Sequence, residues 1–573
     1  MFRRIAAVLG VLVLAGIAVF FYSRTALSPG LPPASAPDGA SARPKPGGTL
    51  TATVRGEIRT FNRFASAGFP THLVSLLTDA RLVSVNPDTD VAEPWLAERI
   101  AGTDTRMDIT LRPGVKFSDG SPLTADDVVW SLKAAYATPP GGIGDVLRID
   151  GAEIQAAAES PTRVILTLPR AWAPAERLLE TLPILPRAVI EPALAAGTFA
   201  NSCPTSAPCP GLGPFVVARY DGGQRVVLTR NPHYWRTSAA GAALPYVDGL
   251  TLEIVPDQNA ELLRLTSGQA DLLQSELRAE DIRTLRPDAD AGRVVLTDVG
   301  AGLDRQVLWF NLGPGPIDPG KAFLRQDAFR QAVSLAVDRT GFANTVYLGA
   351  AEPSSEPVAA ANKLWSAVDL PRPSYNPAQA STLLDGLELR DRNNDGLREY
   401  AAGRPVRFAV LVQSGITAAQ TATSFLRDAL ANVGVGVDIV ALDLGGVMGA
   451  WQQGKYDTVF HFIQVSDTDP AANLDFWLSS GGSHLWHPGQ TTPATPWEAE
   501  IDRRMLMMAS MLDRSSRVRE FTEVQRLVLT HNPAIWFAAP HVFVATRPRV
   551  GGVRPRLTRP QVLWRADELY LQN

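Results

Sequence analysis

The chain has 573 residues, which is too long for one hydrophobic core, so we expect two or three domains. Hydrophobic residues make up 45% of the chain and charged residues 20%, as in an ordinary globular protein. The formal net charge of −4 excludes a protein that binds nucleic acid through a strongly basic surface.

The N-terminal segment differs from the rest of the chain. After Arg3 and Arg4, residues 5–22 form an uncharged apolar run at the lower length limit of a membrane-spanning helix. The two arginines favour a cytoplasmic N-terminus, so everything that follows is expected outside the cytoplasm. We therefore expect residues 1–24 to be either a cleaved signal peptide or a signal-anchor helix in the cytoplasmic membrane. Residues 25–47, rich in Pro, Ala and Ser, are the expected linker.

The first folded elements are a strand over 48–54 and a helix over 74–84. A strand, two turns and a capped helix follow between residues 107 and 135. Apolar and polar residues alternate from Met107 to Arg112, which predicts a half-buried strand. Thr124 then occupies an N-cap position, and Asp127 three residues later completes a capping box.

Two cysteines, Cys203 and Cys209, are the only ones in the chain. Outside the cytoplasm, a pair this close is expected to form a disulfide that closes a small loop. A metal site is the alternative, but no His or Cys stands near them to complete it.

The expected secondary structure changes along the rest of the chain, from mostly strands to alternating helices and strands. Strands dominate first, and the expected ones are 164–168, the hairpin 215–220 with 225–229, 250–255 and 307–312. Helices and strands then alternate, and the expected ones are a helix from Phe329, a helix at 377–384, a strand at 407–412, a helix at 417–433, a strand at 437–441, a helix at 517–530 and a strand-like run at 534–544. This alternation predicts an α/β lobe in the second half.

Several segments together resemble one family, the extracytoplasmic solute-binding proteins of family 5, which serve peptide- and nickel-type ABC importers. The resemblance extends from about residue 47 to 570, with its segments in the family's order. They are ITLRPGVKFSDGSPLTADDVVWSLK (109–133), GLGPFVVARY (211–220), LTRNPHYW (228–235), YVDGLTLEIVPD (246–257), LLRLTSGQADL (262–272), FRQAVSLAVDR (329–339), Asn376-Pro377, GKYD (454–457) and Asn532-Pro533.

The resemblance implies an α/β fold of the two-lobed periplasmic-binding-protein type, class II or cluster C, with mixed sheets and a hinge of two crossovers. The first lobe would span 48–303 and be completed by 537–573, and the second would span 304–536. Such a protein closes on its solute and delivers it to the permease subunits of an ABC importer. It implies a monomer without catalysis, cofactor or nucleic acid. Family members take di- and oligopeptides, nickel complexes or sugars, so the family does not name the solute.

The resemblance also points to ligand-binding residues in the second lobe. Peptide-binding members hold the ammonium group of the ligand with an aspartate shortly before an acidic-Pro pair. Here Asp469-Pro470 is that pair, Ser466 stands where the family has its aspartate, and Asp467 is adjacent. We expect Ser466, Asp467 and Asp469 to include ligand contacts, although the missing aspartate puts peptide binding in doubt. The alternative is a capped turn between a strand and a helix.

Other candidates lie on loops and on the hinge strand. The loop 64–72 corresponds to a cleft-lining loop of the family, and Ser66 and Phe69 are its candidate ligand contacts. Asn311 lies next to a crossover. Trp477 and Trp486 could offer stacking surface to a ligand, but core packing is the better-supported interpretation of each tryptophan.

Two motifs raise the question of a metal. The segment from Asp391 to Gly396 begins like a calcium loop, but its twelfth position is Ala402 where the pattern needs Glu, so a polar turn is favoured although Glu399 could ligate. His484 and His487 are spaced i, i+3 in a loop that we expect to be exposed.

Three classes of function remain. The main hypothesis is a solute-binding protein of an ABC importer, and the second is a membrane-anchored sensor or scaffold with the same fold. An extracytoplasmic hydrolase is disfavoured, because the sequence has no Gly-x-Ser-x-Gly, His-Glu-x-x-His or phosphate-binding Gly-Lys-Ser/Thr motif.

Overall fold

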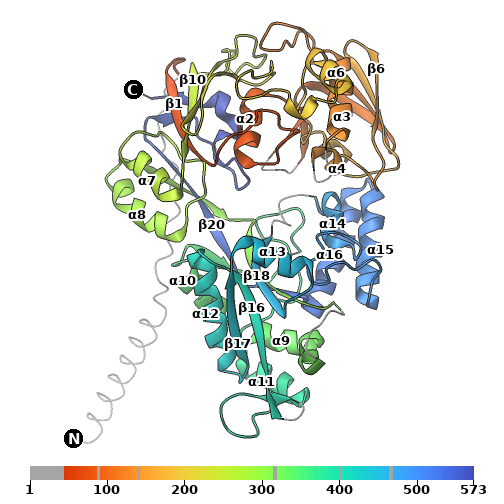
Figure 1. The fold of residues 1–573 in the computed structure, drawn as a ribbon, viewed down its shortest axis with the longest axis vertical. Coiled ribbons are helices and arrows are strands. Elements are labelled where there is room, and N and C mark those ends of the chain that lie inside the picture. The colour runs from red at the N-terminus through yellow and green to blue at the C-terminus, as the bar shows by residue number, and fades with distance from the viewer. Residues whose placement is uncertain are drawn as a thin grey trace, which may run out of the picture. The chain divides into compact units, whose positions relative to one another are not determined.

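The computed structural model describes residues 44–572 except 87–88, 90, 139–141, 314–318, 368, 401–402 and 464–468. Residues 44 onward form one compact unit (Figure 1). The expected signal or anchor segment and residues 25–43 of the linker lie outside the described residues, as do Ser466 and Asp467. Within the part of the chain that is described, no helix has the length and apolar character needed to cross a membrane.

A mixed four-stranded sheet carries the first part of the chain, which we call the first lobe. Its strand order is β1-β10-β9-β8. The strand β1 (Thr49–Arg55) pairs in parallel with β10 (Gly249–Val255), and the hairpin of β8 (Phe215–Asp221) and β9 (Arg225–Arg230) adds antiparallel strands. Gly223 in the hairpin turn has a φ of +67°, a conformation that glycine adopts without strain. The predicted first strand and hairpin are confirmed.

An antiparallel sheet forms the other part of the first lobe, with the order β4 (Ala97–Thr103), β5 (Arg106–Leu111), β7 (Arg163–Thr167) and β6 (Gln155–Ser160). Helix α3 (Ala125–Tyr136) contacts β6 and β7. The capping box is present, because the Asp127 Oδ2 atom accepts the Thr124 backbone N–H at 2.7 Å.

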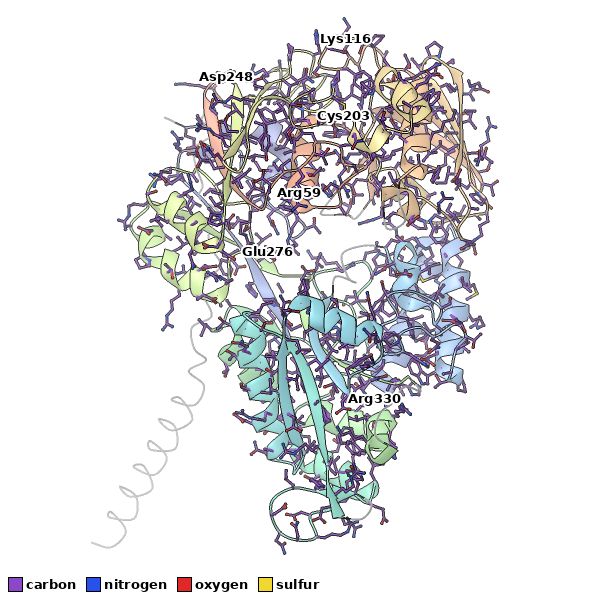
Figure 2. All side chains as sticks on the ribbon, viewed as in Figure 1. Arg59, Lys116, Cys203, Asp248, Glu276 and Arg330 are labelled. Carbon is purple, nitrogen blue, oxygen red and sulfur yellow. A yellow bond between two sulfur atoms is a disulfide. The ribbon has the colours of Figure 1, made fainter. Side chains whose placement is uncertain are left out.

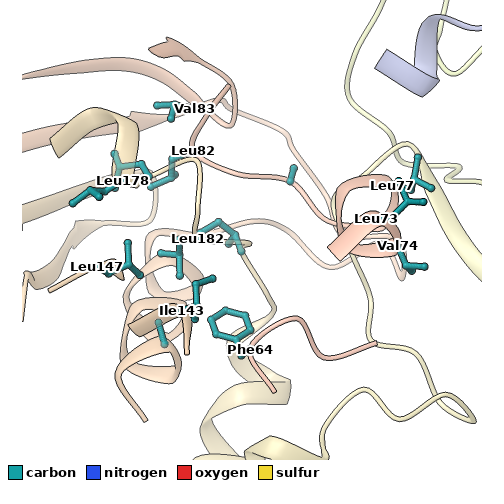
Figure 3. Packing of buried hydrophobic residues seen from close by; sticks show 14 of the residues in the cluster. Phe64, Leu73, Val74, Leu77, Leu82, Val83, Ile143, Leu147, Leu178 and Leu182 are labelled. Carbon is teal, nitrogen blue, oxygen red and sulfur yellow. The ribbon is translucent and has the colours of Figure 1, made fainter. Parts of the chain in front are cut away.

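Helix α2 (Phe69–Thr78) starts and ends earlier than the helix expected at 74–84. Pro70 lies in its first turn, where the missing N–H of proline is tolerated, so the proline marks the start of the helix. Residues 83–85 form strand β2 instead of a helix end. The helix buries Leu73, Val74 and Leu77 in the core of the first lobe (Figure 3).

A five-stranded mixed sheet carries what we call the second lobe. Its strands in spatial order are β17 (Gly436–Leu442), β16 (Arg407–Gln413), β18 (Thr458–Ile463), β12 (Arg305–Phe310) and β19 (Ala534–Trp536). Helices α9 (Asp327–Leu335) and α12 (Thr417–Ala431) confirm the helices predicted from Phe329 and at 417–433. The apolar stripe of α9, which includes Phe329, Ala332 and Val333, is buried.

Further helices and short strands complete the fold. The helices are α4 (Ile143–Val146), α5 (Ala175–Leu178), α6 (Arg187–Ala195), α7 (Gln258–Thr266), α8 (Ala279–Asp290), α10 (Arg339–Val346), α11 (Pro377–Gly386), α13 (Leu444–Gln452), α14 (Leu474–Trp477), α15 (Pro496–Ser510) and α16 (Arg514–His531). The short strands are β3 (Ala92–Pro94), β14 (Glu399–Tyr400), β15 (Arg404–Pro405), β21 (Val550–Gly551) and β22 (Tyr570–Leu571).

Two connections join the lobes. The chain passes from β11 (Val295–Ala301) to β12, and it returns from β19 to β20 (Ala538–Thr546), so the apolar run expected as one strand at 534–544 is two strands in different sheets. Strand β20 pairs with β11 and with β13 (Ala351–Pro353). The two connections match the two crossovers that the family resemblance implies. The lobe boundaries 48–303, 304–536 and 537–573 stay a prediction.

The C-terminal segment packs against the first lobe. The Tyr234 hydroxyl donates to the Asp567 Oδ2 atom at 3.0 Å, and Arg236 forms a buried ion pair with the same carboxylate. The Arg236 guanidinium also lies 4.3 Å from the ring centroid of Trp95. The disulfide expected between Cys203 and Cys209 is present in this lobe (Figure 2).

Candidate ligand-binding site

A cavity of about 750 Å³ is lined by residues of both lobes and of both connections between them. This volume is in the range of sites that hold small organic ligands. The first lobe contributes Phe69 and Glu276, the connections contribute Arg305 and His541, and the second lobe contributes Phe462. Figure 2 labels Glu276 beside β20 at this cavity.

Apolar side chains form part of the wall. Phe69 stands at the first position of α2, where the loop that precedes the helix gives way to its first turn. Phe462 on β18 is 38% exposed, which is unusual for a phenylalanine of a central strand. Ile416 and Val346 add aliphatic surface from the second lobe. The cavity can therefore bury apolar parts of a ligand from both sides.

Charged side chains in the wall are paired within the chain. Glu276 accepts two hydrogen bonds from the Arg559 guanidinium, at 3.0 and 3.2 Å, and one from the Gln561 amide at 2.7 Å. Arg278 donates to both carboxylate oxygens of Asp281, at 2.9 and 2.7 Å. These bidentate pairs hold their charges in a fixed geometry.

Arg305, at the start of β12, is buried at the first connection. Its guanidinium donates to the Ser354 Oγ atom at 2.9 Å and to the Glu356 and Pro357 carbonyl oxygens at 2.6 and 2.8 Å. Burial lowers the pKa of Arg305 to about 10, although the carboxylates of Glu356 and Asp304 oppose this change. Arg305 thus ties the connection to the segment that follows β13.

His541, on the returning strand β20, joins three strands. Its Nδ1 atom lies 2.8 Å from Asp298 Oδ2 on β11, and its Nε2 atom lies 3.6 Å from Glu352 Oε1 on β13. The hydrogen bond to Asp298 raises the pKa of His541, while burial acts in the opposite direction. Through these two contacts, the His541 imidazole links β11, β13 and β20 at the edge of the cavity.

Two glutamine side chains of the wall have buried amide atoms without a hydrogen-bond partner among the described residues. Within the described residues, neither the Nε2 nor the Oε1 atom of Gln274 has a hydrogen-bond partner, although the residue is only 3% exposed. The Oε1 atom of Gln306 on β12 is likewise buried without a partner among those residues. Buried polar groups are normally paired, so these amides are exceptions that need a reason.

The family can now be assigned. The family model described as "Bacterial extracellular solute-binding proteins, family 5 Middle" matches residues 91–484. The chain belongs to this family. The predicted family and its two-lobed α/β fold are confirmed.

Relatives of this family 5 protein cover almost the whole chain. A Deinococcus radiodurans protein named "Probable ABC transporter-binding protein" is 24% identical over 548 residues, which are 90% of each chain. The oligopeptide-binding protein AppA of Bacillus subtilis is 22% identical over 526 residues, 89% of this chain and 90% of AppA. The crystal structure of the ABC transporter substrate-binding protein CtaP from Listeria monocytogenes superposes with a TM-score of 0.76 at 20% identity, covering 92% of this chain and all of CtaP.

The two candidate ligand contacts of the first lobe, Ser66 and Phe69, lie in different places. Phe69 lines the cavity. The Ser66 Oγ atom instead accepts the Gly68 backbone N–H at 3.2 Å, and the Ser66 carbonyl accepts from Arg63 at 2.9 Å. Ser66 is therefore engaged in the turn that leads into α2, and it is not one of the described residues that line the cavity.

Asn311, Trp477 and Trp486 lie in the core of the second lobe and not in the cavity wall as described. The Asn311 amide donates both N–H groups, to the Gly454 and Tyr456 carbonyl oxygens at 2.9 and 2.8 Å, and its Oδ1 atom accepts the Gly313 backbone N–H at 3.0 Å. Trp486 stacks on Trp309 with ring centroids 6.4 Å apart, and Trp477 meets Phe521 edge-on at 5.1 Å. Core packing therefore accounts for both tryptophans.

Asp469 is buried beside Arg517 and forms an ion pair with it. Its Oδ1 atom also accepts the Ala471 backbone N–H at 3.0 Å, which caps the turn after it. The carboxylate thus has two partners inside the second lobe, and its contact with a ligand stays a prediction. The capped turn weighed as the alternative for this segment is the observed state of Asp469.

In the two segments considered as metal sites, Asp391, His484 and His487 contact other groups of the chain. The Asp391 Oδ2 atom accepts the Gly396 backbone N–H at 3.0 Å, which forms the favoured polar turn. His484 and His487 are buried rather than exposed, and both face Glu498 Oε1, at 3.7 and 3.9 Å. Across the described ranges, no group of three or more His, Cys, Asp or Glu side chains is arranged to hold a metal ion.

Sequence reasoning did not find Gln274, Gln306, His541 or Arg305. None of them lies in a motif with a recognised chemistry, and glutamines in a strand or loop carry no pattern of their own. Only the fold brings these positions to one cavity.

Proposed function

We propose that this family 5 protein binds a small, peptide-like solute in the cavity and delivers it to the permease subunits of an ABC importer. The cavity carries this proposal, because residues of both lobes and both connections line it. A solute that touches both lobes stabilises the closed arrangement more than the open one, and so shifts the population towards closure. The relative named as an oligopeptide-binding protein supports the peptide-like class.

The proposal includes an extracytoplasmic location and action as a monomer without catalysis. The run 5–22 either anchors the protein in the cytoplasmic membrane or is removed as a signal peptide. N-terminal sequencing of the mature protein separates these alternatives. An intact Met1 means anchoring, and a start between residues 25 and 48 means release.

The test is a thermal-unfolding screen of the full-length protein, purified in mild detergent, against small solutes, together with mass spectrometry of any ligand that co-purifies. A bound solute at about 100 times its Kd stabilises the folded state by about 2.7 kcal/mol. Phe462→Ala, at the cavity wall, should weaken binding, while Tyr375→Ala, an exposed aromatic away from the cavity, should not. If no solute in a broad screen raises the unfolding temperature, the proposed function is wrong.

A further inference from the structure

The charges around the cavity leave little for a charged ligand to pair with. Each charged side chain of the described wall already has a partner in the chain. The pairs of Glu276 and Arg278 and the contacts of Arg305 and His541 are given above. The other charged side chains are also engaged. The Arg55 Nε atom lies 3.3 Å from Glu261 Oε2, and the Asp257 Oδ1 atom accepts the Ala260 N–H at 2.9 Å. The Glu280 Oε1 atom lies 3.5 Å from Arg278 Nε, and Asp304 has a partner as well.

A charged group entering this cavity would have to compete with these existing pairs. Breaking a pair leaves its partner without compensation in a partly desolvated place, which is unfavourable. Recognition of a ligand's ammonium or carboxylate group by the wall therefore carries a penalty here. The second-lobe carboxylate Asp469 offers no alternative, because Arg517 and the Ala471 N–H already occupy it.

Among the described residues of the wall, Gln274 and Gln306 are the neutral side chains with buried atoms that lack a hydrogen-bond partner. The Arg305 Nε atom lacks one as well, but three acceptors already hold the rest of that guanidinium. An amide offers both a donor and an acceptor, so it matches a neutral amide or a hydroxyl group. Gln274 follows β10 and α7 in the first lobe, and Gln306 lies on β12 of the second lobe, so one ligand could engage both lobes through neutral groups.

Resting on the proposed function, we propose that the cavity recognises its solute through neutral hydrogen-bonding groups, amides or hydroxyls, held by Gln274 and Gln306 rather than by ion pairs. Gln274 is the specificity-determining residue, because neither its Nε2 nor its Oε1 atom has a hydrogen-bond partner among the described residues. A peptide would be held along its backbone and not by its charged ends. A neutral oligosaccharide offers the same chemistry through hydroxyl groups.

The experiment uses the full-length protein and three sets of probes, measured by calorimetry. They are tri- to hexapeptides with free ends, the same peptides acetylated and amidated at their ends, and the neutral trisaccharide raffinose. Capped peptides or raffinose should bind at least as tightly as the free peptides. Their affinity should also stay nearly constant between low and high salt, because no exposed ion pair is formed. The capped-peptide and raffinose arms tell an amide ligand from a hydroxyl ligand.

Gln274→Leu tests the residue itself. The variant should lower the affinity for the neutral probe roughly 10-fold or more through its lost hydrogen bonds. Its unfolding temperature without ligand should not fall, because an unpaired buried amide is replaced by an apolar group of similar size. Gln490→Leu is the matched control. Gln490 is also buried with both amide atoms unpartnered among the described residues, but it is not in the cavity wall, so its loss should leave affinity unchanged.

Three outcomes separate the hypotheses. Binding of free peptides more than about 10-fold tighter than capped ones would show that charged ends are recognised, and it would overturn this inference while leaving the proposed function intact. Unchanged affinity of Gln274→Leu would also overturn it. Failure of every solute, charged or neutral, to bind would overturn both proposals.

Discussion

Arg517 on α16 and Asp469 at the start of the turn before α14 form a buried ion pair inside the second lobe. The Arg517 Nε atom also donates to the Met508 carbonyl oxygen at 3.2 Å, and its guanidinium lies 5.0 Å from the ring centroid of Trp365. The pair thus connects the turn to the packed helices α15 and α16. Its role is to hold the second lobe together.

Removing one partner should show this role. Asp469→Ala should lower the free energy of unfolding by about 3–5 kcal/mol, because Arg517 remains buried without its counter-charge. Urea denaturation measures the change, and the double variant Asp469→Ala/Arg517→Met should recover part of it. A single variant that stays fully stable but loses solute affinity would instead identify Asp469 as a ligand contact.

The disulfide should contribute to the stability of the first lobe. The double variant Cys203→Ser/Cys209→Ser should lose about 2 kcal/mol of unfolding free energy, since the bond closes a short loop in the unfolded chain. Differential scanning calorimetry checks this. Dithiothreitol should lower the unfolding temperature of the natural protein and leave that of the variant unchanged. An equal response of both proteins would contradict this prediction.

The His541–Asp298 pair should make stability depend on pH. Because the folded-state pKa of His541 is raised, its contribution is fully present below the ordinary histidine pKa of about 6.5 and is lost as the pH rises through the raised value. Burial alone would raise the pKa of Asp298, but the hydrogen bonds from His541 and from the Gly300 N–H, together with the charge of His541, lower it. The Asp298 contribution is therefore present above the ordinary aspartate pKa and is lost as the pH falls through the lowered one.

Thermal unfolding between pH 5.5 and 8.5 measures this dependence. The natural protein should lose stability towards the alkaline end, and His541→Gln should flatten the profile. His233→Gln, which changes a histidine on an exposed turn, is the control and should keep the slope. An unaltered profile in His541→Gln would exclude the pair as its source.

The capping box of α3 should matter locally. Thr124→Ala should lower the free energy of unfolding by about 1 kcal/mol, the usual effect of losing an N-cap side chain. Thr284→Ala, at an exposed position inside α8, should change it much less. Chemical denaturation of both variants decides whether the cap contributes.

Local sequence signals predict a large part of this fold. The capping box at Thr124, the hairpin around Gly223 and the stripe of α9 depend on residues a few positions apart, so the chain displays them directly. The break of the run 534–544 at Phe537 is different. It arises because β19 and β20 join different sheets, and no local pattern marks that change.

The candidate site was harder to predict for the same physical reason. His541 and Asp298 are 243 positions apart, and the cavity combines residues from nearly the whole chain. Phe69 and Trp486 look alike as aromatic residues near loops, but one lines the cavity and the other stacks in the core. Burial separates them, and burial is a property of the tertiary structure.

The return of the chain from β19 to β20 also constrains how the protein is made. Strand β20 completes the sheet with β11, and Asp567 pairs with Arg236 more than three hundred positions earlier. The first lobe therefore lacks a strand and a buried counter-charge until residues 538–567 have been synthesised. Although its residues emerge first, this lobe finishes folding last, and a chain cut short after the second lobe leaves both of them with open edges.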